Sequence, residues 1–540
     1  MFATAKEIST SFGAKECTEL AKKWLTDCVN LHKDCNRTSP SRRPQRLINI
    51  GSDNTKMRLS EDKAVCAPYA ALSHCWGKSH PITTKLSTIN CRRQNLDWSL
   101  LPATFRDAIT VTRGLGLSYL WIDSLCVIQD DDRDWEVESA KMGSIYEGAY
   151  VVIAASMSSD PDCSFLSPRK NMFTDFLEVT YRQKDGSHRL VKARPVMVLN
   201  KSIDPLGRRA WTFQEQRHAV RLLRYSTTEL QWNCRTKLGC ECESTHVKAS
   251  ISDIIYGRYC IRDVNSSSEQ VFSEWQTMLP SYTRRSLTKT SDILPAISGI
   301  AEHIYEKTSS SYLAGLWKDN VLSDLLWQVS LYLRDDISDY NGNIWGFSLL
   351  RTMSTYRAPT FSWASIDSEV ENICDDFDTD AQMDAVILDA QCALKGANPF
   401  GYITARYEDD VVGKRETLEY MGRFEPNHHG MTTDMIADFP LVECLAWTEA
   451  GVRVRTMRRA SVGDDLKSIT GSVFCVALFR GLKGRQFGLV LGHSPRVPGA
   501  YERLGVMAFD RVYSYGDGKR VEFAAEVWFA GAERYAVTIV

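Results

Sequence analysis

The sequence lacks an apolar run long enough to cross a membrane. A spanning helix needs about 20 apolar residues, whereas the longest apolar stretches, around residues 119–128 and 472–479, have the length of strands. The first residues also lack the basic-then-apolar pattern of a secretory signal. We therefore expect a cytoplasmic protein with no membrane span.

An excess of charge of one sign is also missing. The 65 Lys and Arg balance 67 Asp and Glu, so no overall field favours nucleic acid or an anionic membrane. No Gly-rich phosphate loop of Walker or Rossmann type is present, which argues against an ATPase or a hydride-transfer enzyme. The 16 cysteines do not follow the spacing of a secreted disulfide scaffold, and we expect them to be reduced.

Paired Cys-x-x-Cys knuckles are absent, although one segment carries metal-type residues. Residues 14–35 are predicted to form a helix, and four residues recur on one of its faces: Trp24, Cys28, His32 and Cys35. This face could bind zinc if Cys234, Cys240 or Cys242 supplied a fourth ligand. Without a knuckle, we favour packing of the helix against the next domain and predict no metal site.

What the sequence does contain is an alternation of strand and helix patterns from Tyr69 to about Cys234. This alternation is typical of an α/β domain with a parallel sheet. The first strand, Tyr69–His74, runs into the polar and aromatic cluster SHCWG at residues 73–77. In doubly wound folds ligands bind at the carboxyl ends of such strands. We therefore expect a functional site there.

Two further elements are predicted to reach the same edge of the sheet. The apolar run Tyr119–Ile128 is predicted as a central strand, interrupted by Asp123, and residues 134–149 are predicted as one helix. A stripe along this helix is apolar except for one carboxylate: Trp135, Glu138, Met142, Tyr146 and Ala149. Burying a carboxylate is costly unless it is paired or protonated.

Glu138 therefore has two interpretations that the residues leave open. It forms a buried ion pair with an arginine such as Arg106, Arg113 or Arg208, or it has a functional role. A cysteine hydrolase built from His74, Cys126 and Asp123 is a weaker alternative, because Cys126 lies in an apolar run where a thiol is usually inert.

Three segments, in order, resemble the three blocks of the fungal heterokaryon incompatibility (HET) domain. They are YAALSHCWG, the long segment GLSYLWIDSLCVIQDDDRDWEVESAKMGSIYEGAYVVIAAS, and RRAWTFQEQ. The flanking segments WLTDCVNLHKDC, PQRLINIG, YLAGLW and RAPTFSWASID resemble the lead-in and the downstream region of long family members. One departure is His74-Cys75, where many relatives have Tyr and a variable residue, and it puts any role for position 74 in doubt.

This resemblance implies a protein of fungal non-self recognition, in which incompatible partners trigger growth arrest or cell death. The HET domain is remotely similar to the TIR domain, a flavodoxin-like fold. Some TIR domains cleave NAD+ with a Glu placed shortly after a Trp at the start of a helix, and Trp135 followed by Glu138 matches that arrangement. The resemblance thus implies NAD+ as substrate, Glu138 as the catalytic residue, and no cofactor or metal.

The remaining site residues are expected to bind NAD+. Trp76 could stack on a ring of the ligand, and Gly77 would let the backbone approach it closely. The full predicted binding set is Ser73, His74, Trp76, Gly77, Asp123, Trp135, Trp211 and Glu215. Trp76 and Gly77 have a simpler interpretation as a packed turn, and Trp211 and Glu215 as an ordinary helix start.

The chain is predicted to divide into four segments. They are an N-terminal helix and linker (1–60), the HET domain (61–245, core 69–215), a helical region (246–358) and a β-rich module (359–540). Within these segments a hairpin turn is predicted at Asp185-Gly186, helices over residues 275–305 and 312–333, and a first C-terminal strand over 361–366. We expect self-association or pairing with another incompatibility protein, and no nucleic-acid partner. The alternative function is a non-enzymatic signalling module that oligomerises or recruits partners.

Overall fold

The structure is a computed structural model in which the chain folds into two compact units. The first comprises Met1–Cys260, Arg285–Leu287 and Pro295–Ile300, and the second the rest. The structure describes residues 6–13, 15–36, 43–61, 67–77, 82–169, 177–182, 185–193, 204–242, 266–330, 356–372, 398–402 and shorter pieces, mostly strands, between 382 and 539. No helix in these ranges is long and apolar enough to span a membrane.

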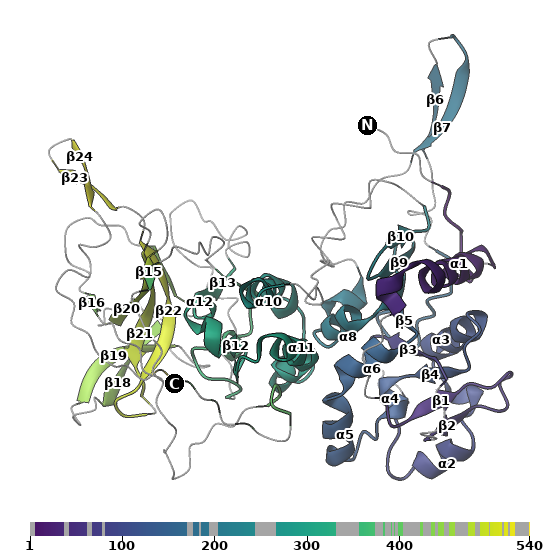
Figure 1. The fold of residues 1–540 in the computed structure, drawn as a ribbon, viewed down its shortest axis with the longest axis horizontal. Coiled ribbons are helices and arrows are strands. Elements are labelled where there is room, and N and C mark those ends of the chain that lie inside the picture. Colours follow the sequence, from purple (N-terminus) through teal and green to yellow (C-terminus); the bar gives the residue numbers. More distant parts are fainter. Residues whose placement is uncertain are drawn as a thin grey trace. The chain divides into compact units, whose positions relative to one another are not determined.

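An eight-stranded mixed sheet forms the centre of the first unit (Figure 1). Its order is β10-β9-β8-β5-β3-β4-β1-β2. The strands are β1 Leu47–Asn49, β2 Arg58–Ser60, β3 Tyr69–Ser73, β4 Tyr119–Trp121, β5 Val151–Ala154, β8 Arg221–Tyr225, β9 Leu230–Cys234 and β10 Leu238–Cys240.

The four central strands are parallel. β3 pairs with β4 on one side and with β5 on the other, and β5 pairs with β8. Numbered in chain order, these strands lie in the order 2-1-3-4, which is the start of the flavodoxin-like order. The α/β fold class predicted from the sequence is confirmed, and the strand order reverses between β3 and β5, the topological switch point.

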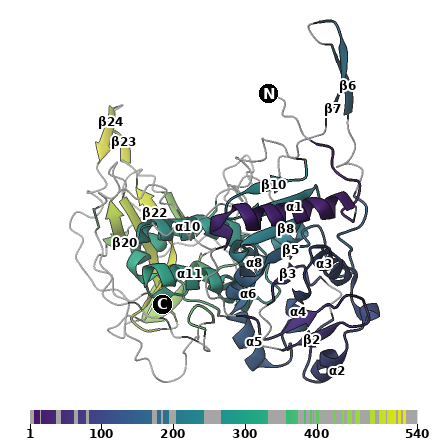
Figure 2. The same ribbon diagram turned by 45° about the vertical axis from the view of Figure 1, so that its right-hand side comes forward.

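Burial explains why these segments form central strands. Every residue of β3 and β5 is buried, as expected for parallel strands covered on both faces. The helices of this unit are α1 Lys15–Leu31, α2 Ile89–Gln94, α3 Ala103–Gly114, α4 Asp123–Cys126, α5 Asp132–Ser139, α6 Met142–Gly148 and α8 Thr212–His218. The predicted helix over 14–35 thus ends at Leu31, and α1 packs on β9, where Trp24 contacts Trp232. Figure 2 shows α1 beside the labelled strands β8 and β10.

The predicted strand Tyr119–Ile128 is wrong in its second half. β4 ends at Trp121, and Asp123–Cys126 form the short helix α4. Polar contacts turn the backbone here: the Asp123 carboxylate accepts from the Ser124 N–H at 2.7 Å, and the Cys126 carbonyl accepts from Arg46 Nε at 2.6 Å. The change matters for function because it places Asp123 directly after the strand.

The predicted single helix over 134–149 is two helices. α5 ends at Ser139 and α6 begins at Met142, with a tight turn in which the Lys141 N–H donates to the Glu138 carbonyl. The inward stripe nevertheless survives, because Glu138, Met142 and Tyr146 are all buried.

A hairpin of β6 Leu177–Arg182 and β7 His188–Ala193 confirms the turn predicted at Asp185-Gly186. Gly186 has a positive φ of 83°, a conformation that glycine adopts without strain.

Residues 266–330 contain helices α10 Ser268–Thr283 and α11 Ser298–Thr308, as predicted. The helix predicted over 312–333 is wrong for the described residues 312–330. Strands β11 Tyr312–Leu313 and β12 Leu316–Trp317 pair through a turn at Ala314 and Gly315, both with positive φ. Within the described residues 312–330, the 3₁₀ turn Lys318–Asn320 and the helix α12 Val321–Asp324 are the helical parts, before β13 Trp327–Val329.

The second unit ends in β-rich structure, as predicted. Its largest sheet is antiparallel, with β20 Val473–Arg480, β21 Gln486–His493 and β22 Tyr501–Phe509 at the centre, joined by β15 Gln382–Met383, β16 Gly422–Phe424 and β17 Asp434–Ala437. Among the described residues, three more antiparallel pairs are β13 with β14 Val370–Asn372, β18 Leu441–Trp447 with β19 Arg453–Arg459, and β23 Val512–Gly516 with β24 Lys519–Phe523. Residues 361–366, predicted as a strand, instead contain a 3₁₀ turn at Trp363–Ser365.

Candidate functional site

Polar side chains from three elements meet at the carboxyl ends of β3 and β4. Ser73 Oγ, at the end of β3, donates a hydrogen bond of 2.6 Å to Glu215 Oε2 on α8. Trp76 Nε1 donates one of 2.7 Å to Asp123 Oδ2, just after β4. The negative charge of Asp123 also raises the pKa of the Glu215 carboxyl group. We call Ser73, Trp76, Asp123 and Glu215 the switch-point cluster, and it lies where doubly wound domains bind ligands.

The Glu215 carboxyl is the most electrostatically unusual group of this cluster. Burial raises its pKa to about 7, since the charged form loses its hydration. The Ser73 hydrogen bond opposes this shift, the Asp123 charge adds to it and the Arg209 guanidinium opposes it. A carboxyl group that titrates near neutral pH is suited to proton transfer, which an ordinary surface carboxylate is not.

His74 lies beside the cluster without joining its hydrogen bonds. Burial lowers the pKa of its imidazole to about 4, so the ring is neutral at physiological pH. Its Nδ1 is 3.7 Å from Asp123 Oδ1, beyond hydrogen-bond distance, and its Nε2 has no partner within the described part of the chain. The ring packs edge-on against Phe105, so its contacts are those of a core residue.

The cysteine-hydrolase alternative receives no support from this geometry. Cys126 is fully buried, and burial raises the pKa of its thiol to about 12. A protonated, buried thiol is not a nucleophile.

The backbone conformation of Gly77 and its neighbour Asp160 both exclude a larger residue at this position. Its φ is +64°, and a Cβ placed there would lie 2.2 Å from Asp160 Oδ2 and 2.9 Å from Asp160 Cα. The close approach that glycine permits is therefore to Asp160 of the chain itself. This contact fixes the turn that carries Trp76.

Trp135 and Trp211 contact each other rather than standing apart. Their ring centroids are 6.4 Å apart in an edge-to-face arrangement, and both side chains are half-buried. Because Trp135 lies on α5 and Trp211 precedes α8, the pair joins the helix of Glu138 to the helix of Glu215.

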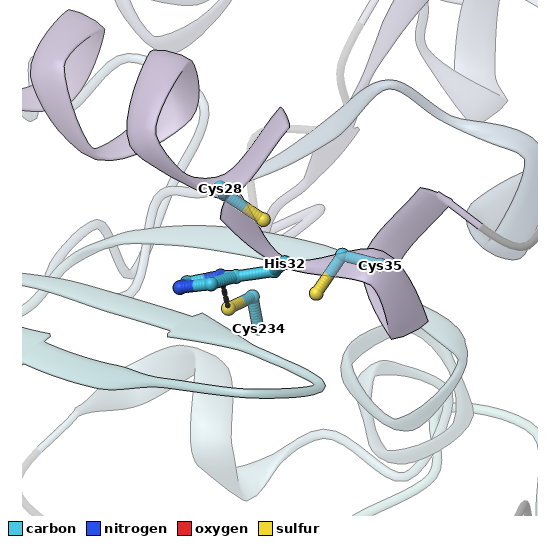
Figure 3. Close-up of side chains that lie close together, drawn as sticks. All are labelled: Cys28, His32, Cys35 and Cys234. Carbon is cyan, nitrogen blue, oxygen red and sulfur yellow. Dashed lines mark hydrogen bonds between the residues drawn. The ribbon is translucent and has the colours of Figure 1, made fainter. Parts of the chain in front are cut away.

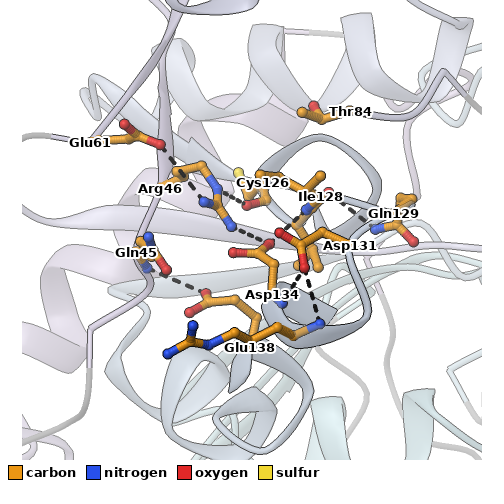
Figure 4. A network of polar contacts seen from close by, with 12 residues as sticks. Gln45, Arg46, Glu61, Thr84, Cys126, Ile128, Gln129, Asp131, Asp134 and Glu138 are labelled. Carbon is orange, nitrogen blue, oxygen red and sulfur yellow. Dashed lines mark hydrogen bonds and ion pairs between the residues drawn. The ribbon is translucent and has the colours of Figure 1, made fainter. Parts of the chain in front are cut away.

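Glu138 belongs to a different polar group (Figure 4). Its side chain is 0% exposed, and its Oε1 accepts from Lys141 Nζ at 2.8 Å. Its Oε2 accepts from the Gln45 N–H at 3.3 Å. Glu138 therefore forms a buried ion pair, which is one of the two interpretations that the sequence left open. Its partner is Lys141 and not one of the three arginines considered.

Arg46 is the central cation of this second group. It is 2% exposed, pairs with Asp134, donates to the Cys126 carbonyl and interacts with the charge of Glu138. Asp134 Oδ2 also accepts from the Ile128 N–H at 2.8 Å. We call Arg46, Asp134, Glu138 and Lys141 the ion-pair network. Each carboxylate in it has a cation, so the charges are stabilised within the fold.

Sequence reasoning missed Arg46, Lys141 and the role of Tyr146, whose hydroxyl donates to the Leu72 carbonyl and lies next to Glu215. Lys141 was open to prediction, since it stands three residues after Glu138 on a helical pattern. Arg46 carried no signal, because its partners are about 80 residues away in sequence.

Among the described residues of the first unit, two groups of side chains could hold a metal ion. Cys28, His32, Cys35 and Cys234 place their ligand atoms within 4.8 Å of one another, and so do Glu229, Cys240 and Cys242. Of the three cysteines considered as a fourth ligand, Cys234 is thus the one beside the first group. The packing predicted for this helix is also present, since Cys28 and Cys35 are buried.

The strand order defines a doubly wound α/β domain. The polar cluster lies at the edge of the sheet where such domains bind ligands. Residues 69–215 match the family model described as heterokaryon incompatibility protein (HET). The chain therefore contains a HET domain at these residues, and the match supports a role in heterokaryon incompatibility. No curated protein and no solved structure shows a significant match to the chain.

Proposed function

We propose that the protein is an incompatibility effector that promotes cell death, and that its HET domain cleaves NAD+ into nicotinamide and ADP-ribose. Activity would follow self-association or pairing with another incompatibility protein. The TIR resemblance suggests the reaction, and the flavodoxin-like order of the central strands is consistent with it.

The observation that carries the proposal is the Ser73–Glu215 hydrogen bond at the switch point. It holds a carboxyl group whose pKa is raised to about 7 beside Asp123. Trp76 and Asp123 are the half-buried members of the cluster. The indole of Trp76 offers a stacking surface for nicotinamide or adenine, and the carboxylates offer acceptors for ribose hydroxyls.

The chemistry needs few groups. The bond between ribose C1′ and the pyridinium nitrogen breaks, and its electron pair leaves with neutral nicotinamide. The remaining oxocarbenium-like ribose is stabilised by the Asp123 carboxylate, as glycosidases stabilise theirs. Water adds to C1′ and gives its proton to ionised Glu215, which yields ADP-ribose. No electron acceptor is required.

Glu138 remains the carboxylate that the TIR resemblance suggests. In its present contacts it is 0% exposed and paired with Lys141, so a ligand would reach it only after that pair opened. Both carboxylates are buried, but Glu138 is paired with a cation, whereas Glu215 has a raised pKa and lies beside the half-buried Asp123, so the proposal assigns the catalytic role to Glu215.

The test is to incubate purified full-length protein with NAD+ and to quantify nicotinamide and ADP-ribose by chromatography. Monomeric and self-associated fractions are assayed separately. We expect both products, in equal amounts, from the assembled wild type, and a loss of at least about 100-fold for Glu215→Gln. A self-associated wild type that releases no nicotinamide would contradict the enzymatic proposal.

A second candidate function is a non-enzymatic signalling module. The observation that favours it is the complete pairing of Glu138, which leaves the carboxylate expected to be catalytic inside the fold. This function predicts that Glu215→Gln and Glu138→Gln variants still provoke incompatibility when expressed in a tester strain, provided that they still self-associate.

A further inference from the structure

We propose that the first unit holds a structural zinc ion bound by Cys28, His32, Cys35 and Cys234. Figure 3 shows the four side chains pointing toward one another, from α1 and the segment after it on one side and from the end of β9 on the other. This site lies outside residues 69–215, so the family match does not include it.

The four ligands come from two short, well-defined pieces of backbone. Cys28 lies in the last turn of α1, His32 follows its end, and Cys35 is in the 3₁₀ turn Lys33–Asn36. Cys234 is the last residue of β9, at the turn into β10. The C-x₃-H-x₂-C spacing thus supplies three ligands from one chain segment, and a hairpin end supplies the fourth.

The distances suit a tetrahedral ion. With Zn–S about 2.3 Å and Zn–N about 2.0 Å, the ligand atoms of a tetrahedral site with three sulfurs and one nitrogen lie about 3.5–3.8 Å apart. Here all four atoms lie within 4.8 Å of one another, and Cys234 Sγ is 3.3 Å from His32 Nδ1. A contraction of about 1 Å, within the reach of side-chain rotation, would complete the coordination.

The chemistry of the donors selects zinc. Three thiolates and one imidazole form a soft ligand set that calcium and magnesium do not use. Cys28, Cys35 and Cys234 are 0%, 2% and 6% exposed, so the set is largely closed to water. Four protein ligands leave no open position, which is the arrangement of a structural zinc site and not of a catalytic one.

Each sulfur also has a hydrogen-bond donor beside it. Arg221 Nε donates to Cys28 Sγ at 3.3 Å, and the Lys237 N–H donates to Cys234 Sγ at 3.2 Å. Thr236 Oγ1 lies 3.6 Å from Cys35 Sγ and can donate to it. Such outer contacts orient metal ligands and stabilise thiolates.

Arg221 supplies the charge that the site needs. Zinc with three thiolates carries a net charge of −1, and the buried Arg221 guanidinium offsets it. The same side chain donates to the Cys35 carbonyl at 2.9 Å and to Asn36 Oδ1 at 2.7 Å, so it also fixes the segment that presents Cys35.

The consequence is a clamp between distant parts of the chain. Zinc would join the end of α1 to the β9–β10 edge of the sheet, linking residues 28 and 234 across most of the unit's sequence. Metal-binding free energy would then contribute to folding. On this account zinc would fasten the helix α1 to the edge of the sheet on which it packs.

The experiment is to express the full chain with zinc in the medium and to measure metal content by mass spectrometry. We expect about one zinc per chain for the wild type and for Cys91→Ser, an exposed cysteine outside the cluster. Cys234→Ser and His32→Ala should lose most of it. X-ray absorption of the wild type should show about three sulfurs at about 2.3 Å and one nitrogen at about 2.0 Å.

A second measurement on the wild type avoids dependence on variants that fail to fold. Chelation followed by Co²⁺ addition should produce thiolate-to-cobalt charge-transfer absorption with tetrahedral ligand-field bands. The proposal is overturned if folded wild type carries no zinc and gives no such spectrum, or if Cys28 and Cys234 are found in a disulfide. Equal zinc in wild type and Cys234→Ser would also overturn it.

Discussion

The switch-point cluster and the ion-pair network both contain a buried carboxylate on a helix, yet the two sites differ in whether a cation neutralises that carboxylate. Glu138 is paired with Lys141 and lies near Arg46. Glu215 has a serine hydroxyl as its hydrogen-bond partner, and its pKa is raised to about 7. Burial alone therefore does not identify a functional carboxylate, and the nature of its partner is the more informative property.

Removing the cation should break the ion-pair network. Arg46→Met leaves Asp134 and Glu138 buried without their shared guanidinium, and we expect a loss of about 3–5 kcal/mol in the free energy of unfolding. Denaturant titration, with hydrogen exchange in residues 119–154 as the local probe, measures it. Arg93→Met is the control, since Arg93 pairs with Glu61 at the surface, and it should cost at most about 1 kcal/mol. Equal losses in the free energy of unfolding for the two variants would contradict the difference between the buried network and the surface pair.

The pH dependence of stability should reveal the opposite situation at Glu215. Its pKa is near 4.5 in the unfolded chain and about 7 in the folded one. Between these values the folded state holds more protons, so stability falls as pH rises and the loss reaches about 3 kcal/mol above pH 7. Glu215→Gln should remove this part of the pH dependence, while Glu178→Gln on the exposed strand β6 should not. Parallel profiles for wild type and Glu215→Gln would refute the assignment.

The turn that holds the switch-point cluster can be tested with two glycines. Gly77 and Gly116 both have positive φ, but only Gly77 has Asp160 where a Cβ would be, and Gly116 has nothing within 4 Å. Gly116→Ala should cost about 1 kcal/mol for the backbone conformation. Gly77→Ala should cost about 2 kcal/mol more, because Asp160 must move. Thermal unfolding of both variants measures the difference, and a difference near zero would contradict this role.

The smallest expected effect is at Trp76. Trp76→Phe keeps an aromatic ring but removes the indole N–H that donates to Asp123. We expect a loss of about 1 kcal/mol, since the pair is half-buried. The proposed stacking surface survives, so NAD+ affinity measured by calorimetry should fall less for Trp76→Phe than for Trp76→Ala. Equal affinities for the two variants would argue against stacking.

Local pattern was enough to predict the strands of the parallel core, since β3 and β5 are continuous apolar runs, and it was enough to place Ser73, Trp76 and Asp123 at one edge. Local pattern was not enough to predict the polar partners of these side chains. Asp123 follows a three-residue strand because Arg46 donates a hydrogen bond to the Cys126 carbonyl. These two residues are 80 positions apart in sequence. The pair of Glu138 with Lys141 is an exception, because its i,i+3 spacing on a helix is a local pattern.

In the C-terminal half, local sequence pattern is again not enough to predict the structure. Residues 312–333 have helical spacing, but Trp317 is fully buried beside Trp275, and the Asp324 carboxylate accepts the Trp317 N–H at 2.7 Å. Burial raises the pKa of Asp324 to about 7. Tertiary contacts of this kind override local periodicity, so strand pairs form where a helix is predicted.

The most direct test of the central claim is the pH profile of nicotinamide release by self-associated wild type, Glu215→Gln and Glu138→Gln. If ionised Glu215 accepts the proton of water, the wild-type rate should rise with pH through about 7, Glu138→Gln should keep that profile, and Glu215→Gln should lose the rate. The reverse result, with Glu138→Gln inactive and Glu215→Gln retaining both rate and profile, would contradict the account.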